Sequence, residues 1–342
     1  MCPRVPWYKR AMAGALVGDA AGAVLEFHRE PITAEKAEAA MRMPGGGTWN
    51  VGPGQITDDG ELTLALWNTL KRWPSLTGIP VTNMIRTYAE WLKSRPFDVG
   101  GTCGYAFAQA SRVVAATPEG ESLNTYAIRE MYSDIDQNNM ESEANGCLMR
   151  STAIACWVAL GQDTPAIRAI QAAEADAELS HPNVVCREVN AVYVAACTLL
   201  MRGVAPEEVL AMITEYVEKN VTSPSVKKWF LEDSLADPGT MDCKVNAGHV
   251  RWAFTLAMHF LRRPEVSYEE AIRVTLMKGG DTDTNACIVG GLVACYQPIP
   301  SYMLDPVLTF DCTACGSGGS SRGQKRPAAY SARAYFPYPE QC

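Results

Sequence analysis

The sequence predicts an all-α fold, and three observations support this prediction. Apolar residues recur at three- and four-residue spacing along most of the chain, as they do on the buried face of a helix. Convincing strands, with alternating apolar and polar residues, are absent. Ala-rich stretches such as "VNAVYVAACTLLM" are typical of helices that are buried on most sides. We therefore expect one compact multi-helix domain over about residues 7–297 and a C-terminal tail over 298–342.

The first element is expected to be a helix within "GALVGDAAGAVLEF". Gly14, Gly18 and Gly22 are four residues apart, so they share one helix face and allow another backbone to approach closely. Each costs about 1 kcal/mol relative to Ala in a helix interior, so a packing reason is expected. Asp19 and Glu26 are seven residues apart, which places both on one face of the same helix. The plainer alternative is tight helix packing with two solvated acids.

The apolar periodicity then predicts a series of helices along the domain. They cover residues 62–70, 81–92, 104–116, 151–160, 184–202, 206–217, 249–262 and 269–277. Thr57, Asp58 and Asp59 stand just before the first of these. Asp58 could be an N-cap, with Glu61 three residues on as its partner in a capping box. That account needs only one acid, so it leaves the adjacent pair unexplained.

Two further polar segments stand at helix starts. "NGCLMRS", residues 145–151, could bind phosphate through the backbone N–H groups at the start of the helix. Arg150 could pair with that phosphate, or equally with the nearby Glu141 or Glu143. "SHPNVV" places His181 ahead of a long buried helix, where a cap or a satisfied surface histidine is the plainer interpretation.

A second acidic cluster, Asp281 to Asn285, opens the last apolar helix of the domain. Carboxylate and hydroxyl oxygens suit hard cations such as Mg²⁺, Mn²⁺ or Ca²⁺. An EF-hand is excluded, because Ala286 and Leu292 occupy the positions at which that loop needs Gly and Glu. Zinc is disfavoured, since no Cys or His cluster lies nearby. We therefore expect the two distant acidic clusters to meet, where a pair of Mg²⁺-type ions about 3.5–4 Å apart would suit them.

The composition limits the classes of protein that remain. Of the 342 residues, 47% are hydrophobic and 20% charged, which is typical of a globular protein with a sizeable core. The net charge of −8 argues against unmodified nucleic acid as a partner, because phosphate contacts require a basic face. No membrane partner is expected, since no apolar run reaches the roughly 18 residues of a spanning helix. The twelve cysteines are scattered, so we expect reduced thiols and a cytoplasmic protein.

The tail differs from the domain in composition. "CGSGGSSRGQKRP", residues 315–327, consists of small and basic residues and is expected to be flexible. It is followed by the aromatic "AYSARAYFPYPEQC". We expect the tail to be disordered or docked on the surface.

Taken together and in this order, these segments resemble the ADP-ribosylglycohydrolase family, which contains the dinitrogenase-reductase-activating glycohydrolase and the ADP-ribosylhydrolases. The matching segments are "GALVGDAAGAVLE", "ITDDGELTLAL", "NGCLMRSTAIA", "SHPNVV" and "GGDTDTNACIVGGLVA". The resemblance covers roughly residues 10–297. It implies an all-α fold on which the two acidic clusters hold a binuclear Mg²⁺ centre, with Mn²⁺ as an alternative.

The resemblance also implies roles for individual residues. The metal ligands would be Thr57, Asp58, Asp59, Asp281, Asp283 and Thr284. The contacts with the substrate would come from Asp19, Tyr132, Asn145, Gly146, Arg150 and His181. Glu26 or Asp59 would be the catalytic base, and which of the two stays open. The chain departs from the family at Gly60 and Leu62, where many members have Thr and Met.

The reaction implied by the resemblance is hydrolysis of the glycosidic bond between ADP-ribose and an acceptor, most simply a modified protein side chain. ADP-ribose and the ADP-ribosylated protein would be the partners, and we expect a monomer. Three alternatives stay open: a hydrolase of a free ADP-ribosyl compound or nucleotide sugar, a module that binds ADP-ribose without cleaving it, and a structural protein. The acids of both clusters are all present, which favours an enzyme.

Overall fold

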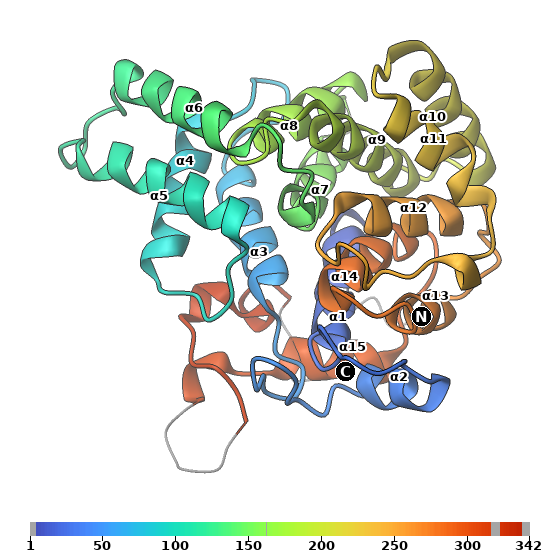
Figure 1. Ribbon diagram of the computed structural model, residues 1–342. Coiled ribbons are helices and arrows are strands. Elements are labelled where there is room, and N and C mark those ends of the chain that lie inside the picture. The colour runs from blue at the N-terminus through green and yellow to red at the C-terminus, as the bar shows by residue number, and fades with distance from the viewer. Residues whose placement is uncertain (1–4, 162, 316–321, 337–342) are drawn as a thin grey trace.

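The computed structural model describes residues 5–161, 163–315 and 322–336 (Figure 1). Within these residues the regular structure is helical, apart from two isolated antiparallel bridges, Gly46 with Val51 and Ala144 with His249. The prediction of an all-α fold is confirmed. The α-helices are α1 (Arg10–Gly22), α2 (Ala34–Met41), α3 (Asp58–Leu70), α4 (Val81–Lys93), α5 (Gly101–Ala115), α6 (Thr125–Asn139), α7 (Thr152–Leu160), α8 (Ile167–Glu178), α9 (Val184–Met201), α10 (Pro206–Asn220), α11 (Pro224–Leu231), α12 (Val250–Leu261), α13 (Tyr268–Leu276), α14 (Thr282–Val293) and α15 (Ser301–Thr309).

The eight helices predicted from apolar periodicity are all present as α3, α4, α5, α7, α9, α10, α12 and α13. Their ends differ from the prediction by at most four residues. The periodicity did not indicate α2, α6, α8, α11 or α15. In α6 the reason is plain, because only Met131, Ile135 and Asn139 of its 15 residues are buried. One buried position per turn, with the polar Asn139 at the last, leaves too narrow an apolar stripe to be recognised against the polar residues around it.

Helices α1 and α14 lie together at the centre of the fold, with their backbones unusually close. A Cβ atom at Gly14 would lie 2.2 Å from the Gly290 carbonyl oxygen, and one at Gly18 would lie 2.0 Å from that of Ala286. At Gly22 it would lie 2.3 Å from the Cα atom of Asp283. The prediction that these glycines admit another backbone is confirmed. The close approach also brings the second acidic cluster against the end of α1.

Helix α9 belongs to the core. Its residues Val184–Met201 have the length and apolar composition of a membrane span, yet 83% of this stretch is buried inside the fold. The helix packs against α7, α8, α10, α11, α12 and α14. Burial against other helices accounts for its apolar composition.

The described part of the tail is packed against the domain. Helix α15 buries Met303, Leu304, Val307 and Leu308, and the last described residue, Phe336, is 1% exposed. Part of the stretch expected to be flexible, residues 316–321, lies outside the described residues. Residues 322–336, drawn in red in Figure 1, run close to the start of α3. They bring Arg326 into the interior, where it is 4% exposed.

Candidate functional site

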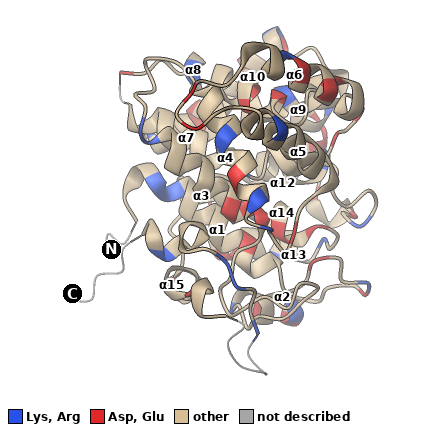
Figure 2. Cartoon of the chain, turned by 90° about the vertical axis from the view of Figure 1, so that its left-hand side faces the viewer, with Lys and Arg blue, Asp and Glu red and all other residues tan. Residues whose placement is uncertain are grey.

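A cavity of about 310 Å³ opens where α3, α5 and α14 begin. Six carboxylate side chains line it, and Figure 2 shows acidic residues gathered between the labels of α1, α3 and α14. The lining residues are Glu26, Phe27, Trp49, Asp58, Asp59, Asp98, Val99, Gly100, Gly101, Thr102, Cys103, Ala144, Asn145, Gly146, Met149, His181, Asp281, Asp283 and Thr284. The fold thus brings the two acidic clusters, more than two hundred residues apart in the sequence, to one cavity.

Asp19 on α1 holds the start of α3 and is not among the residues that line the cavity. Its carboxylate accepts hydrogen bonds from the backbone N–H groups of Thr57 at 3.0 Å and Gly60 at 2.9 Å, and from the Thr57 hydroxyl at 2.9 Å. Such backbone donors are left unsatisfied at the N-terminus of every helix. The capping box considered for Asp58 and Glu61 is therefore not formed, since Thr57 is the N-cap residue and α1 supplies the cap. A Cβ atom at Gly60 would lie 2.6 Å from the Asp19 carboxylate, so this contact requires Gly there.

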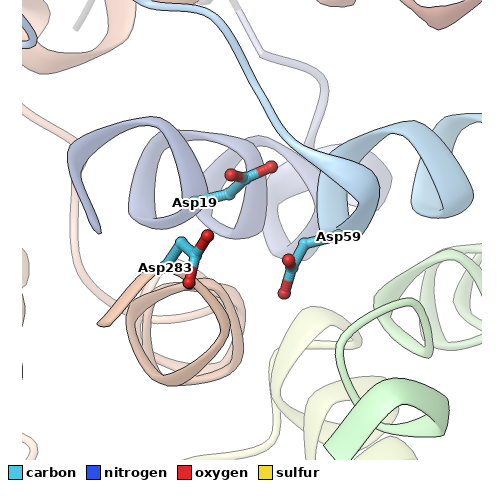
Figure 3. A group of neighbouring side chains, drawn as sticks. All are labelled: Asp19, Asp59 and Asp283. Carbon is cyan, nitrogen blue, oxygen red and sulfur yellow. The ribbon is translucent and has the colours of Figure 1, made fainter. Parts of the chain in front are cut away.

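One group of carboxylates consists of Asp19, Asp59 and Asp283, which come from α1, α3 and α14 (Figure 3). One oxygen of each lies within 4.8 Å of the corresponding oxygens of the other two. Burial and the neighbouring carboxylates raise the pKa of Asp59 and of Asp283 well above the usual range. Burial raises the pKa of Asp19 to about 7. The Oδ1 atom of Asp59 is buried and has no hydrogen-bond partner within the described part of the chain.

A second group consists of Glu26, Asp98 and Asp283, and it shares Asp283 with the first. Its oxygens also lie within 4.8 Å of one another. Glu26 lies beyond the last residue of α1, Gly22, so the expectation that Glu26 and Asp19 share one face of a helix is wrong. The turn that ends α1 directs Glu26 to the cavity, while Asp19 stays inside the fold.

Two residues at this second group, Trp49 and Asp98, were not predicted from the sequence as site residues. Trp49 donates its indole N–H to the Oε2 atom of Glu26 at 2.7 Å. Asp98 lines the cavity from the loop between α4 and α5. Burial, and then the nearby Asp98, raise the pKa of Glu26 to about 8, and burial raises the pKa of Asp98 to about 6. Neither residue belongs to a cluster of similar residues in the sequence, so neither was recognisable as a site residue. The signal that was available near Asp98 is the pair Gly100 and Gly101, which precedes a helix.

The arrangement of acids fits divalent cations. Within the described residues, none of the six lining carboxylates forms an ion pair with a basic side chain. Buried carboxylates without compensating charge are costly to ionise. This cost appears in the raised pKa values of five of them, Glu26, Asp58, Asp59, Asp98 and Asp283. Hard divalent cations take several carboxylate and hydroxyl oxygens as ligands. Asp283 belongs to both groups, so it could contribute to two cation positions. Thr284 lines the same cavity, whereas Thr57 does not. The Thr57 hydroxyl donates hydrogen bonds to the carboxylates of Asp19 and Asp59.

The segment before α7 forms another wall of the cavity. The side-chain amide of Asn145 donates to Asp281 Oδ2 at 2.7 Å, which fixes one carboxylate of the second cluster. The backbone N–H of Asn145 donates to the Gly248 carbonyl oxygen at 3.0 Å, so it is not available to a phosphate as was expected. A Cβ atom at Gly146 would lie 2.7 Å from the Cys103 sulfur, which explains the glycine.

His181 lines the cavity and is completely buried. Its Nδ1 atom lies 2.8 Å from the Ser180 hydroxyl, whereas its Nε2 atom has no partner within the described residues. The interpretation as a surface histidine or helix cap is wrong, because the following Asn183 caps α9. The free Nε2 atom is a polar group that a ligand could satisfy.

Arg150 does not reach the cavity. Its guanidinium is fully buried and forms an ion pair with Asp176 of α8 at 3.0 Å, with neither of the glutamates considered as partners. It also donates to the Gly146 carbonyl oxygen at 2.9 Å and to the Ser180 hydroxyl at 2.8 Å. The expectation of a phosphate contact is therefore corrected, because every strong interaction of Arg150 is with the protein. It supports the cavity wall from behind.

Tyr132 is also placed away from the cavity. It lies on α6 and packs, half-buried, against the hydrophobic core. Burial raises the pKa of its hydroxyl to about 12. The aromatic residues that do line the cavity are Phe27 and Trp49. Tyr132 is not among the residues that line it.

Comparison with known proteins identifies the family of the chain. A family model described as ADP-ribosylglycohydrolase matches residues 7–315, so the chain belongs to the ADP-ribosylglycohydrolase family. It is 27% identical over 326 residues to "Putative ADP-ribosyl glycohydrolase L543" of Acanthamoeba polyphaga mimivirus, which covers 89% of this chain and 92% of the relative. It is 38% identical over 122 residues to the ADP-ribosyl-dinitrogen reductase glycohydrolase of Rhodospirillum rubrum, over 35% of this chain and 40% of that one.

The fold also matches a solved structure. An ADP-ribosylglycohydrolase-related protein complex superposes with a TM-score of 0.66 at 22% identity, over 90% of this chain and 93% of the other. The family and the names of the relatives support an ADP-ribosyl glycohydrolase activity for this chain.

Proposed function

We propose that the protein hydrolyses the glycosidic bond between ADP-ribose and a modified protein side chain, and that it does so with two Mg²⁺ ions. The observation that carries this proposal is the pair of carboxylate groups that meet at Asp283 on the wall of the cavity. Within a family of glycohydrolases, such a site supplies what the reaction needs: oxygen ligands for cations and a carboxyl group for proton transfer.

The residues that would hold the cations are Asp58, Asp59, Asp281, Asp283 and Thr284, together with Asp98. Divalent cations bound there would polarise a ribose hydroxyl or a water molecule. Mn²⁺ offers the same preference for oxygen ligands. Asp19 and Thr57 fix the start of α3 and thereby the direction of Asp58 and Asp59.

Glu26 is the group that we assign to proton transfer. It lines the cavity, and the indole of Trp49 holds one of its oxygens at 2.7 Å, so the orientation of the carboxyl is fixed. Without cations, burial and then Asp98 raise its pKa to about 8. Cations bound at the neighbouring carboxylates would favour the ionised form of Glu26, which is the form that accepts a proton. Asp59 is the second candidate, but its Oδ2 atom already accepts from the Thr57 hydroxyl at 3.1 Å.

The diphosphate of the substrate would lie toward the start of α5. Gly100 and Gly101 line the cavity there, and no side chain caps this helix. A Cβ atom at either position would meet nothing within 4 Å, so the backbone is open to a ligand. Uncapped N–H groups at a helix start bind phosphate oxygens well. This position replaces the backbone of Asn145, whose N–H is already used.

The test is the release of free ADP-ribose from defined substrates. Proteins or peptides that carry ADP-ribose on Arg, on Ser or on an acidic side chain are incubated with the enzyme, with Mg²⁺ and with EDTA. We expect release from at least one of them, only with the metal, and slower release from free nucleotide sugars. Release from nucleotide sugars alone would identify a small-molecule hydrolase. Tight binding of ADP-ribose without any release would identify a binding module.

A further inference from the structure

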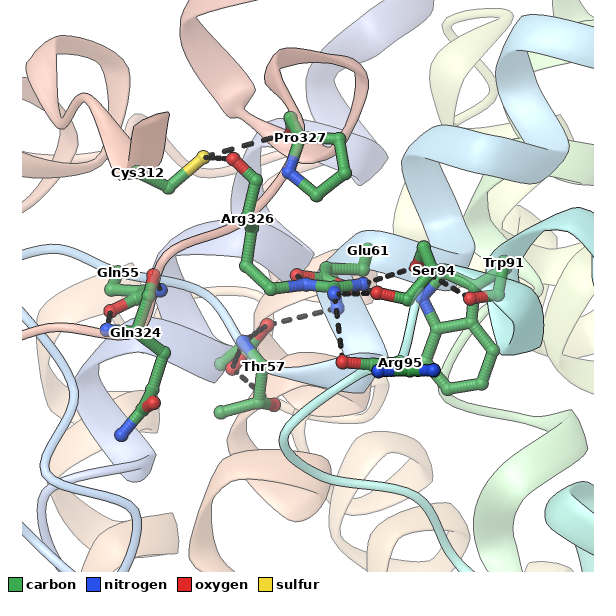
Figure 4. Close-up of polar contacts among 12 residues, drawn as sticks. Gln55, Thr57, Glu61, Trp91, Ser94, Arg95, Cys312, Gln324, Arg326 and Pro327 are labelled. Carbon is green, nitrogen blue, oxygen red and sulfur yellow. Dashed lines mark hydrogen bonds and ion pairs between the residues drawn. The ribbon is translucent and has the colours of Figure 1, made fainter. Parts of the chain in front are cut away.

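A short segment of the tail contacts three separate parts of the chain that carry residues of the cavity or lead directly into them (Figure 4). We call residues 322–326 the strap. Its residues Arg322, Gly323, Gln324 and Arg326 each donate hydrogen bonds to another part of the chain. The elements contacted are the loop 44–55, the first turns of α3, and the end of α4. None of these strap residues lines the cavity itself.

The loop 44–55 is held mainly by Gln324. Its side-chain amide donates to the carbonyl oxygen of Trp49 at 2.6 Å. Its backbone exchanges two hydrogen bonds with the side chain of Gln55, at 2.6 and 2.8 Å. The Gly323 N–H donates to the carbonyl oxygen of Asn50 at 3.0 Å. Because Trp49 in turn donates to Glu26, Gln324 is two hydrogen bonds from the carboxyl group assigned to proton transfer.

Arg326 joins α3 to the end of α4. Its guanidinium forms a two-point ion pair with Glu61, at 2.7 and 2.8 Å. It also donates to the carbonyl oxygens of Ser94 and Arg95, at 2.8 and 3.1 Å, and to the Ser94 hydroxyl at 2.7 Å. All five N–H donors of the side chain are therefore used inside the protein, where Glu61 is 1% exposed. Glu61 receives a further hydrogen bond from Trp91 at 2.9 Å.

The contacts of Arg326 fix the chain just before Asp98. Arg95 has a φ of +56°, a left-handed conformation that a non-glycine residue adopts only when its surroundings hold it there. Its carbonyl oxygen accepts from Arg326, and Asp98 follows three residues later. On the other side of the guanidinium, Glu61 lies two residues after Asp59 on α3.

We propose that the strap positions the catalytic cavity, with Gln324 and Arg326 as its positioning residues. Gln324 sets the place of Trp49, and Arg326 sets the place of the loop that carries Asp98. These are the hydrogen-bond partner and the carboxylate neighbour of Glu26. The strap thus acts on the reaction from outside the cavity. Its effect on turnover rests on the proposed function, whereas its hold on the two loops does not.

The first measurement is hydrogen exchange on the full chain without ligand. Gln324→Ala should raise exchange at residues 46–52 about tenfold, because a single hydrogen bond of the loop is lost. Arg326→Lys should raise it at residues 94–100, since Lys offers three donors without the planar geometry of Arg. Arg262→Met is the matched control, because Arg262 donates to the Phe230 carbonyl oxygen and the Ser234 hydroxyl, away from the cavity. It should change exchange only around those residues.

The second measurement separates positioning from loss of structure. At a temperature at which all variants are folded, Gln324→Ala should lower kcat for ADP-ribose release about tenfold, as expected for one misplaced partner of Glu26. The Mg²⁺ affinity of Gln324→Ala should be unchanged, and Arg262→Met should keep the kcat of the wild-type enzyme. Gln324→Ala leaves the buried ion pair of Arg326 with Glu61 intact. It therefore still tests the strap proposal if Arg326→Lys fails to fold.

Two results would overturn the strap proposal. One is exchange that rises evenly over the chain, or not at all, in Gln324→Ala. The other is a localised rise in exchange with an unchanged kcat. If the wild-type enzyme releases no ADP-ribose from any substrate, the proposed function is refuted and the strap proposal is not. Hydrogen exchange then still decides whether the strap holds the two loops, and uniform exchange would still refute it.

Discussion

Asp283 is the residue at which the chemistry of the site converges. It belongs to both carboxylate groups. Its backbone packs directly on Gly22, because a Cβ atom at Gly22 would lie 2.3 Å from the Cα atom of Asp283. Its own Oδ1 atom accepts the N–H of Thr284 at 2.9 Å, so its direction is fixed by the start of α14. Glu26, in contrast, belongs to one group only and stands at the cavity with Trp49. The two acids should therefore respond differently to neutralisation.

Substitution separates the two roles. Asp283→Asn should abolish both Mg²⁺ binding and activity, because it removes the ligand shared by both groups. Glu26→Gln should still bind Mg²⁺ through Asp58, Asp59, Asp281 and Asp283, yet lose activity about 100-fold or more, the usual size of a proton-transfer contribution. Titration calorimetry and ADP-ribose release measure the two properties. Glu218→Gln, on the exposed face of α10, is the control and should change neither. Full activity of Glu26→Gln would move the catalytic role to Asp59.

At the scale of elements, the site depends on the contact between α1 and α14. Three glycines of α1 let the two backbones touch, and this contact places Asp19 and Asp283 side by side. Helix α3 is then attached to the pair through the bonds from Thr57 and Gly60 to Asp19. The separation between α1 and α14 therefore controls both the stability of the core and the spacing of the carboxylates.

Replacing one glycine at this contact should be strongly destabilising. In Gly18→Ala the added Cβ atom would lie 2.0 Å from the Ala286 carbonyl oxygen, so the helices must move apart. We expect a loss of about 3 kcal/mol or more in the free energy of unfolding, at the upper end for overpacking. Gly104→Ala in α5 is the matched control, because its nearest contact would be an ordinary 3.5 Å to Val99. It should be neutral or stabilise by up to about 1 kcal/mol. Denaturant unfolding measures both, and equal stability of the two variants would contradict the close packing.

At the scale of the whole molecule, the sequence was informative where a residue pattern is local. The spacing of Gly14, Gly18 and Gly22 predicted a backbone contact, and the ordered motifs predicted that 57–59 and 281–284 meet. The partner of each side chain was not predictable in the same way. Arg150 had two plausible local partners, Glu141 and Glu143, and it pairs instead with Asp176, which is 26 residues further on.

The helices that periodicity missed show the same limit. Helices α2, α6 and α11 are N-capped by Thr33, Asn124 and Ser223, whose side chains accept hydrogen bonds from backbone N–H groups of the first turn. These caps are readable in a sequence, but polar residues are equally common in loops. The strap is a stronger case. Arg326 lies in a stretch of small and basic residues that is typical of a flexible tail, and only the buried Glu61 shows where it belongs.

The clustered acids should make the stability of the whole protein depend on pH in an unusual direction. Without divalent cations, Asp98, Asp19 and Glu26 have pKa values raised to about 6, 7 and 8. A carboxyl whose pKa is raised by folding stabilises the folded state fully below its unfolded pKa, near 4, and this contribution is lost as pH rises through the folded pKa. The EDTA-treated protein should therefore be more stable at pH 5 than at pH 9, with stability falling from about pH 4 upwards, most steeply below pH 6, and levelling off near pH 8.

Mg²⁺ should reverse this trend, because cations bind the ionised carboxylates and stabilise the state that holds them. A pKa shift of one unit corresponds to about 1.4 kcal/mol, and about 1 kcal/mol moves the Tm of a sizeable domain by about 2–4 °C. The Tm with EDTA should thus fall by roughly ten degrees or more from pH 5 to pH 9, and Mg²⁺ should restore it most strongly at pH 9. Calorimetric scans with and without Mg²⁺ test this, and Asp98→Asn should reduce the slope in EDTA by removing one titrating group. A metal-free protein that is as stable at pH 9 as at pH 5 would contradict the buried, uncompensated carboxylates on which the metal site is argued.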